Sequence, residues 1–194
     1  MEKRKLIFFT LFLIILNAKF SNFAFAESEG EKLFKSNQPM EAAIFLEDEI
    51  KNGTASSSAY NYLGLSYFQT GEYEKSVDAF ARGLKVPATN KKILSYNQGN
   101  AYYVMGDYEN AAKSYSLALS ADPKFTDALL NRGNSYLMAA KYPETISDYE
   151  RFIIMEPDNP QRPQIEEILA LLKQELVRLE EEEKMRKEEA ARIA

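Results

Sequence analysis

One pattern recurs three times between residues 57 and 159, at a spacing of 34 or 35 residues. Gly64, Gly99 and Gly133 occupy matching positions, and each is followed by a tyrosine three residues later and by another nine residues later. After the second tyrosine, apolar residues come three or four apart, and each copy closes with a proline. A short internal period of this kind indicates a chain that stacks one small structural unit on the next.

Each copy is predicted to form two antiparallel helices. Tyr60, Leu63, Gly64 and Tyr67 fall on one face of a helix at 100° per residue. A glycine such as Gly71 stands where the first helix has to end before the second one begins. Each helix pair leaves an apolar face that only a neighbouring pair can cover, so about three pairs are needed for stability.

These residues match a known family pattern. The order Leu63-Gly64-x-x-Tyr67, a small residue at Ser76, a large aromatic residue at Phe80 and a closing proline resembles the tetratricopeptide repeat. The resemblance covers residues 57 to about 159. It implies an all-α protein in which helix-turn-helix units stack into a right-handed superhelix, with a concave inner surface that binds other proteins.

The repeat frame divides the chain. The three clear repeats are residues 57–91, 92–125 and 126–159. Residues 27–56 are predicted to be a degenerate leading repeat, because matching positions 34 residues before the first repeat hold Gly30, Leu33, Ala42 and Leu46. An irregular capping hairpin is the alternative for this segment, since terminal repeats are usually atypical.

A helix is predicted to close the array at its C-terminal end. Residues 160–179 carry one apolar stripe, formed by Ile165, Ile168, Leu169, Leu172, Leu176 and Leu179. Residues 180–194 are predicted to continue it as a charged helical extension, with acidic and basic residues four apart. A solvated helix is favoured for this extension, while the start of a coiled coil and a site for a basic partner remain alternatives.

The first 26 residues have the pattern of a secretory signal peptide. Lys3, Arg4 and Lys5 precede an apolar run over residues 6–16, and the small-residue site Ala24-Phe25-Ala26 precedes the predicted cleavage after Ala26. An uncleaved inner-membrane anchor is disfavoured, because eleven helical residues cover only about half of a ~30 Å hydrocarbon core. We therefore expect export to the periplasm or secretion.

Composition excludes several classes of function. The chain has no histidine and no cysteine, so it lacks the usual nucleophile pairs, zinc ligands and lipid-attachment cysteine. We expect no catalytic residue, no metal site and no cofactor, and hence a protein that is not an enzyme. Removal of residues 1–26 leaves 20 basic and 28 acidic residues, a net charge of −8, which argues against binding to nucleic acid.

A binding site is predicted on the first helix of each repeat, on the side away from the helix pair's own core. If the superhelix forms, this side lines its concave groove. The predicted groove residues are Asn61, Leu65, Phe68, Tyr96, Asn97, Asn100, Tyr103, Asn131, Asn134 and Met138. Asn97 with Asn131 and Asn100 with Asn134 line up one repeat apart, so they could pair with the backbone of an extended peptide. Simple exposure of these amides to water is the alternative.

The predicted partner is a protein or peptide with apolar side chains. The family's clamp for acidic C-termini needs Lys and Arg in the groove, whereas Lys91 and Lys92 lie at a helix start and Arg132 lies nearer the core face. The function expected is therefore an interaction scaffold of the cell envelope. A structural element that self-associates through its C-terminal helix is the alternative. Replacing Asn100 and Asn134 by Ala is expected to weaken binding with little change in stability.

Overall fold

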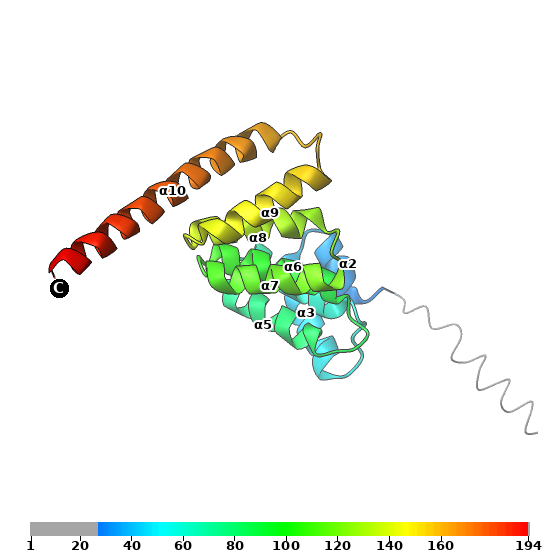
Figure 1. The fold of residues 1–194 in the computed structure, drawn as a ribbon. Helices are drawn as coiled ribbons and strands as arrows, with labels where there is room; N and C mark the ends of the chain where they lie inside the picture. The colour runs from blue at the N-terminus through cyan, green and yellow to red at the C-terminus, as the bar shows by residue number, and fades with distance from the viewer. Residues whose placement is uncertain (1–26, 194) are drawn as a thin grey trace, which may run out of the picture.

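A computed structural model describes residues 27–193, and the predicted signal peptide and Ala194 lie outside the described residues (Figure 1). Within this range the chain is helical and contains no strand. Its helices are α2 (Glu29–Lys35), α3 (Pro39–Lys51), α4 (Ala59–Gln69), α5 (Tyr73–Leu84), α6 (Lys91–Val104), α7 (Tyr108–Ala121), α8 (Thr126–Met138), α9 (Tyr142–Met155) and α10 (Arg162–Ile193).

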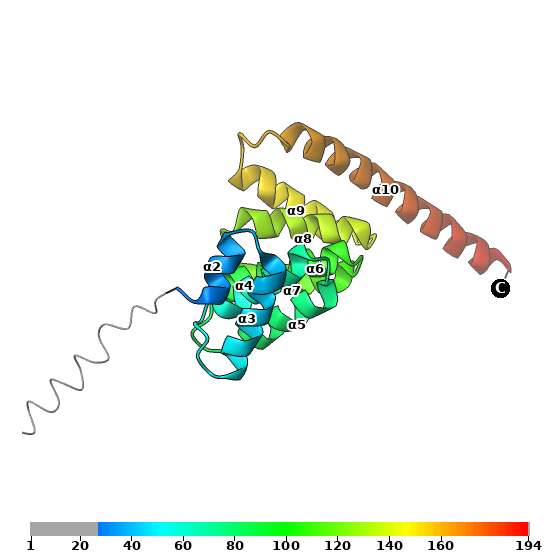
Figure 2. The same ribbon diagram turned by 180° about the vertical axis from the view of Figure 1, so that it is seen from behind.

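The helices pair in chain order and the pairs stack in one direction. The pairs α2–α3, α4–α5, α6–α7 and α8–α9 each pack on the next, and α10 packs on α9 at the C-terminal end (Figures 1 and 2). This arrangement confirms the predicted all-α repeat array, with a leading repeat before the three clear ones and a helix that closes the stack.

The two helices of each pair approach closely at a glycine of the first helix. A Cβ atom added at Gly99 would lie 2.6 Å from the Tyr115 ring, and one added at Gly133 would lie 2.7 Å from the Tyr149 ring. Gly30 faces Leu46 in the same way in the leading pair. Because no side chain fits at these positions, the repeated glycines set the distance between the paired helices.

Four equivalent turns join the helices of each pair with a left-handed residue. Gly71 has φ 80° and Gly106 has φ 77°, while Asn37 and Ala140 adopt φ 59° and 55°. Glycine and asparagine tolerate this conformation better than other residues. The first helix of each pair therefore ends at the same point of the repeat in all four pairs, although the third clear repeat has alanine there.

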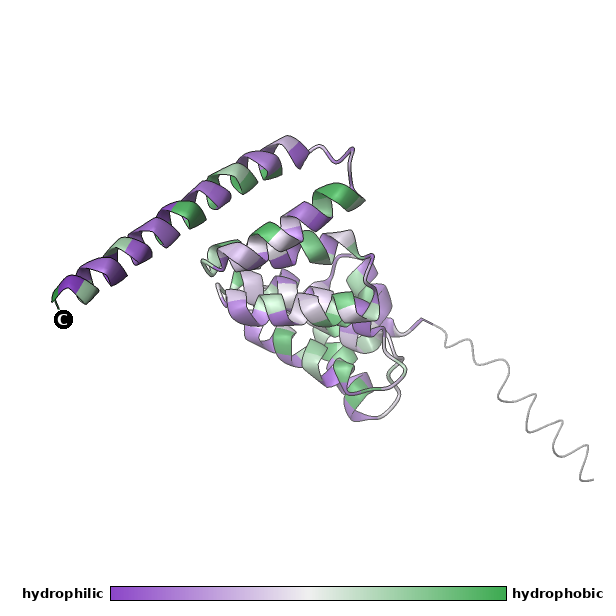
Figure 3. Cartoon of the chain, viewed as in Figure 1, coloured by the Kyte–Doolittle hydropathy of each residue, from purple (hydrophilic) through white to green (hydrophobic). Residues whose placement is uncertain are grey.

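Helix α10 is one continuous helix across the predicted boundary between residues 179 and 180. Ile165, Leu169 and Leu172 are buried against the array, whereas Leu179 is 40% exposed. Hydrophobic residues gather in the first half of the helix, and its last turns are mainly hydrophilic (Figure 3). Within the stripe predicted for residues 160–179, the part from Ile165 to Leu172 is therefore the part that packs on the array.

Candidate functional site

The predicted groove residues lie on α4, α6 and α8, the first helices of the three clear repeats. Nine of the ten are half-buried, and Met138 is exposed. A hollow of about 310 Å³ brings five of them together, and its lining is Phe68, Asn100, Tyr103, Val104, Tyr115, Asn131 and Asn134. Sequence reasoning missed Val104 and Tyr115. We call this cavity the central hollow.

Asn61 belongs to a second hollow of about 320 Å³ near the start of α4 and α6, where it lies beside Tyr62 and Asn90. Leu65, Tyr96, Asn97 and Met138 line neither of these two hollows. The predicted set is therefore divided, and the part that shares one cavity spans three successive repeats.

Two asparagines of the central hollow already bond to tyrosines of their own repeats. The Tyr115 hydroxyl donates to Asn100 Oδ1 at 2.7 Å, and the Tyr149 hydroxyl donates to Asn134 Oδ1 at 2.6 Å. Tyr115 and Tyr149 are 1% and 2% exposed, so water does not replace these acceptors. In contrast to the expectation from the sequence, we therefore predict that removal of either asparagine destabilises the protein.

A coupled pattern in the sequence marks this bond. Position 65 in the first repeat matches positions 100 and 134, and position 80 matches positions 115 and 149. The first repeat has Leu65 with Phe80, whereas the other two have asparagine with tyrosine. An acceptor is present only where the facing ring carries a hydroxyl, as a buried phenol requires. The two positions change together along the sequence, and the structure shows the bond that couples them.

Other asparagines connect neighbouring repeats. Asn97 Nδ2 donates to Asn61 Oδ1 at 2.9 Å. Asn131 Nδ2 donates to the Tyr96 hydroxyl at 3.2 Å and to Asn100 Oδ1 at 3.3 Å. The amides thus form a network across α4, α6 and α8, in which Asn131 of one predicted pair bonds to Asn100 of the other.

The tyrosines of the site remain protonated over the ordinary pH range. Burial raises the pKa of Tyr149 to about 12 and raises the pKa of Tyr115 further. Burial also raises the pKa of Tyr96 and of Tyr103. These hydroxyls therefore act as neutral hydrogen-bond donors or acceptors, and the charge of the hollow does not change near neutral pH.

The basic side chains near the site are held by acidic partners. Arg132 donates to both carboxylate oxygens of Asp148, at 2.7 and 2.6 Å, and to Ser116 Oγ at 3.0 Å. The side chains of Arg132 and Asp148 are 20% and 5% exposed. Lys92 Nζ lies 3.1 Å from Asp122 Oδ2. The central hollow is thus lined by aromatic, aliphatic and amide groups.

Residues 27–193 offer no cluster of three acidic side chains arranged to hold a metal ion. In the same range, no helix combines the length and the apolar character needed to cross a membrane.

Replacing Asn100 by Ala is expected to lower the free energy of unfolding by about 1–3 kcal/mol, because the buried Tyr115 hydroxyl loses its acceptor. The double variant Asn100→Leu with Tyr115→Phe carries the pair found in the first repeat, and it is expected to recover most of this loss. Urea unfolding of both variants measures the difference. Equal destabilisation by the two variants would contradict the role of Asn100 as acceptor.

Comparison with known proteins places this repeat in a family. A model described as tetratricopeptide repeat matches residues 28–90, and one described as TPR repeat matches residues 99–139. The chain belongs to the tetratricopeptide repeat family. The first match includes residues 29–51, which form the leading pair α2–α3.

The sequence relatives of this tetratricopeptide repeat protein are much longer proteins. RNA polymerase II-associated protein 3 of Homo sapiens is 29% identical over 96 residues, which is 50% of this chain and 14% of that protein. Protein O-mannosyl-transferase TMTC1 of Homo sapiens is 25% identical over 150 residues, which is 76% of this chain and 16% of that protein. The chain thus spans about a sixth of the length of these relatives.

Solved structures share the fold. The first TPR of Spaghetti (RPAP3), bound to the HSP90 peptide SRMEEVD, is 26% identical, with 62% of this chain and 93% of that chain covered and a TM-score of 0.54. The second TPR domain of human RPAP3, in complex with the HSP70 peptide SGPTIEEVD, is also 26% identical, with 70% and 98% covered and a TM-score of 0.51. MamA matches at 23% identity, with 66% and 69% covered and a TM-score of 0.61, and this likeness concerns the fold.

Proposed function

We propose that this protein is a scaffold that binds an extended segment of another protein in the central hollow. The observation that carries the proposal is the lining of this cavity, where Phe68, Asn100, Tyr103 and Asn134 come from three successive repeats. A segment that runs along the stack meets aromatic surface for its side chains and amides for its backbone. The peptide complexes of the RPAP3 domains support a ligand of this kind.

The preferred ligand differs from the peptides of those complexes. Both peptides end in the acidic sequence Glu-Val-Asp. In this chain Arg132 is held by Asp148 and Lys92 by Asp122, and neither basic side chain lines the central hollow. An acidic end would lose water without meeting a free positive charge. We therefore propose a neutral segment with apolar side chains, and no nucleic acid or cofactor.

The place of action follows from the first 26 residues. Their basic start, short apolar run and small residues before Glu27 support export, so we propose that the scaffold works in the periplasm or outside the cell. An enzymatic role is not part of the proposal, because a chain without histidine or cysteine offers few groups for acid-base or nucleophilic chemistry. N-terminal sequencing that starts at Glu27 would check the export.

Site-specific photo-crosslinking in cells tests the binding site. A benzophenone amino acid in place of Tyr103 is expected to give a defined crosslinked product. The product should fall about tenfold when both asparagine and tyrosine pairs are exchanged (Asn100→Leu, Tyr115→Phe, Asn134→Leu, Tyr149→Phe), because two backbone-binding amides are lost while the packing is kept. Circular dichroism of the purified variant checks that it is folded.

A matched control uses the same crosslinker at Leu117, which is 55% exposed on α7 and does not line the central hollow. This position is expected to give no such product. An adduct of the same mass from Leu117, or an undiminished adduct from the exchanged variant, would place the binding site elsewhere.

A further inference from the structure

Helix α10 packs on the array through a row of apolar residues, here called the seam. The seam continues along α10 beyond Tyr142, the residue at which α9 begins. Ile165, Leu169 and Leu172 are 4%, 5% and 8% exposed, and Leu176 is half-buried. The same alternation of four and three residues continues along this face through Leu179, Glu183, Arg186, Ala190 and Ile193. Positions spaced in this way lie on one side of a helix, as in the core positions of a coiled coil. We call residues 176–193 the overhang.

Length explains why the overhang lacks cover. Helix α9 has 14 residues and α10 has 32, so at 1.5 Å per residue α10 is longer by about 27 Å. It runs beyond the body of the array in both views (Figures 1 and 2). Leu179 is 40% exposed and Ile193 is 79% exposed. The face that is buried in the first half of α10 is thus open to solvent in the second half.

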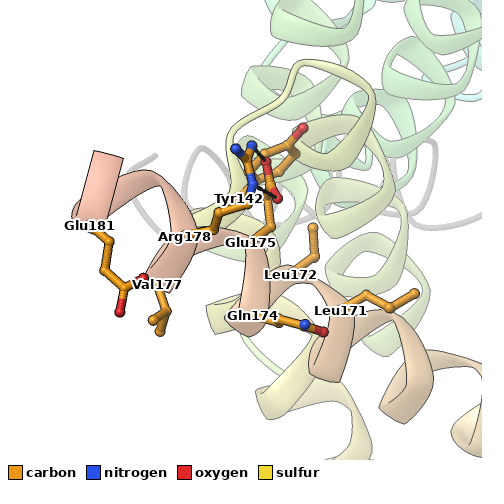
Figure 4. Close-up of a pocket in the computed structure, with 8 residues that line it drawn as sticks. All are labelled: Tyr142, Leu171, Leu172, Gln174, Glu175, Val177, Arg178 and Glu181. Atoms are coloured by element: carbon orange, nitrogen blue, oxygen red, sulfur yellow. Dashed lines mark hydrogen bonds and ion pairs between the residues drawn. The ribbon is translucent and has the colours of Figure 1, made fainter. Parts of the chain in front are cut away.

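A cleft marks the point where the two helices part. It has a volume of about 560 Å³ and is lined by Tyr142 at the start of α9 and by seven residues of α10, which are Leu171, Leu172, Gln174, Glu175, Val177, Arg178 and Glu181 (Figure 4). Leu172, at 8% exposure, points into this corner, and Leu176 follows one turn later. Apolar surface is therefore available from the cleft outward along the seam.

We propose that the overhang pairs with the overhang of a second copy of this chain, as an antiparallel two-stranded coiled coil. In one register the residues facing each other have numbers that sum to 369. Leu176 then faces Ile193 of the second copy, Leu179 faces Ala190, and Glu183 faces Arg186. Each contact occurs twice in the symmetric pair. The two charges inside the seam thus neutralise each other, and the other seam positions are apolar.

Charge decides the direction of the helices. In a parallel pair each seam position faces itself, so Glu183 would meet Glu183 and Arg186 would meet Arg186. Antiparallel pairing replaces these like-charge contacts by opposite ones. On one flank of the antiparallel seam Glu180 approaches Lys187 of the second copy, which is also favourable.

The other flank brings Glu182 towards Glu189 of the second copy. Within each chain Arg178 bonds to Glu182, and Arg192 lies 3.6 Å from Glu189, so both carboxylates have a basic neighbour. Glu183 bonds to Lys187 at 2.7 Å in the single chain and has a side chain that is 52% exposed. It can therefore turn to Arg186 of a second copy without leaving a buried charge.

Charge exchange in the full chain tests the pairing. Sedimentation over a concentration series up to about 100 µM should show a dimer. Glu183→Arg alone and Arg186→Glu alone should each weaken the dimer about tenfold, because each puts two like-charge pairs in the seam. The combined variant should restore the dimer. The control Glu188→Arg, off the seam, should dimerise about as well as the parent, because it changes the net charge of the overhang only from −1 to +1 and puts no like-charge pair in the seam.

Disulfide mapping tests whether the two helices run antiparallel. Because the chain has no cysteine, only the introduced residues can form a disulfide. A mixture of Leu179→Cys and Ala190→Cys chains should form a crosslinked heterodimer under mild oxidation, whereas Leu179→Cys alone should not crosslink to itself. In the antiparallel register two copies of residue 179 are about 16 Å apart along the axis, beyond the reach of a disulfide. A monomer at all concentrations, self-crosslinking of Leu179→Cys, or failure of the combined charge variant to restore the dimer would overturn the proposal.

Discussion

Replacing Asp148 by Ala is expected to lower the free energy of unfolding by about 3–5 kcal/mol, the usual cost of removing one partner of a buried ion pair. Asp148 is 4% exposed, and both of its carboxylate oxygens accept hydrogen bonds from Arg132. The variant leaves a guanidinium group between α8 and α9 with Ser116 as its remaining side-chain hydrogen-bond partner and without an opposite charge. Urea unfolding monitored by circular dichroism measures the loss.

The first repeat supplies the control for this variant. Leu63 and Ala79 occupy the positions that match Arg132 and Asp148, and both are fully buried. The double variant Arg132→Leu with Asp148→Ala therefore installs an apolar pair that this fold already accommodates. It is expected to regain most of the stability, because an apolar pair of suitable shape replaces a buried ion pair at little cost. If the double variant is as unstable as Asp148→Ala, the loss comes from packing and not from the unpaired charge.

Replacing Gly99 by Val is expected to destabilise the protein by about 3 kcal/mol or more through overpacking. Even the Cβ atom of the new residue would lie 2.6 Å from the ring of Tyr115. The ring has no room to move aside, since Tyr115 is 1% exposed and its hydroxyl is bonded to Asn100. The helices α6 and α7 would have to separate, which disturbs the packing of the neighbouring pairs as well. Thermal and urea unfolding both measure this effect.

The matched control is Lys113→Val, which places the same side chain at an exposed position within α7. It is expected to cost only the lower helix propensity of valine, about 0.5 kcal/mol. Gly99→Ala should also destabilise, although alanine favours helix over glycine by about 1 kcal/mol. A gain in stability from Gly99→Ala would show that the helix pair can open at this point without penalty.

Much of the fold was predictable because it depends on spacing along the chain. The 34- or 35-residue period, the glycine at each close approach and the apolar stripe of residues 160–179 each reflect a local rule of helix geometry. Even the degenerate leading pair follows from counting back, since Gly30 faces Leu46 as Gly99 faces Tyr115. The overhang was less readable, because Glu183 and Arg186 interrupt its apolar pattern.

The candidate site was predictable as a face but not as a set of contacts. Helical angles placed Phe68, Asn100, Tyr103 and Asn134 on one side of the first helices, and the structure gathers them in the central hollow. The same angles do not say that Tyr115 reaches Asn100 or that Asn131 bonds to Tyr96. Those contacts join different helices, and they depend on how far apart the helices lie and how they cross.

The sequence by itself determined the repeat, the helix pairs and the family, because periodic side chains dictate which face of each helix is buried. Only the tertiary structure decided which polar groups satisfy each other. Asn100 and Asn134 serve buried tyrosines, and Arg132 serves Asp148, so these groups stabilise the array as well as line or flank the hollow. The physical reason is that a buried donor must find an acceptor within about 3 Å. That distance is set by packing between helices, whereas periodicity is a property of each helix alone.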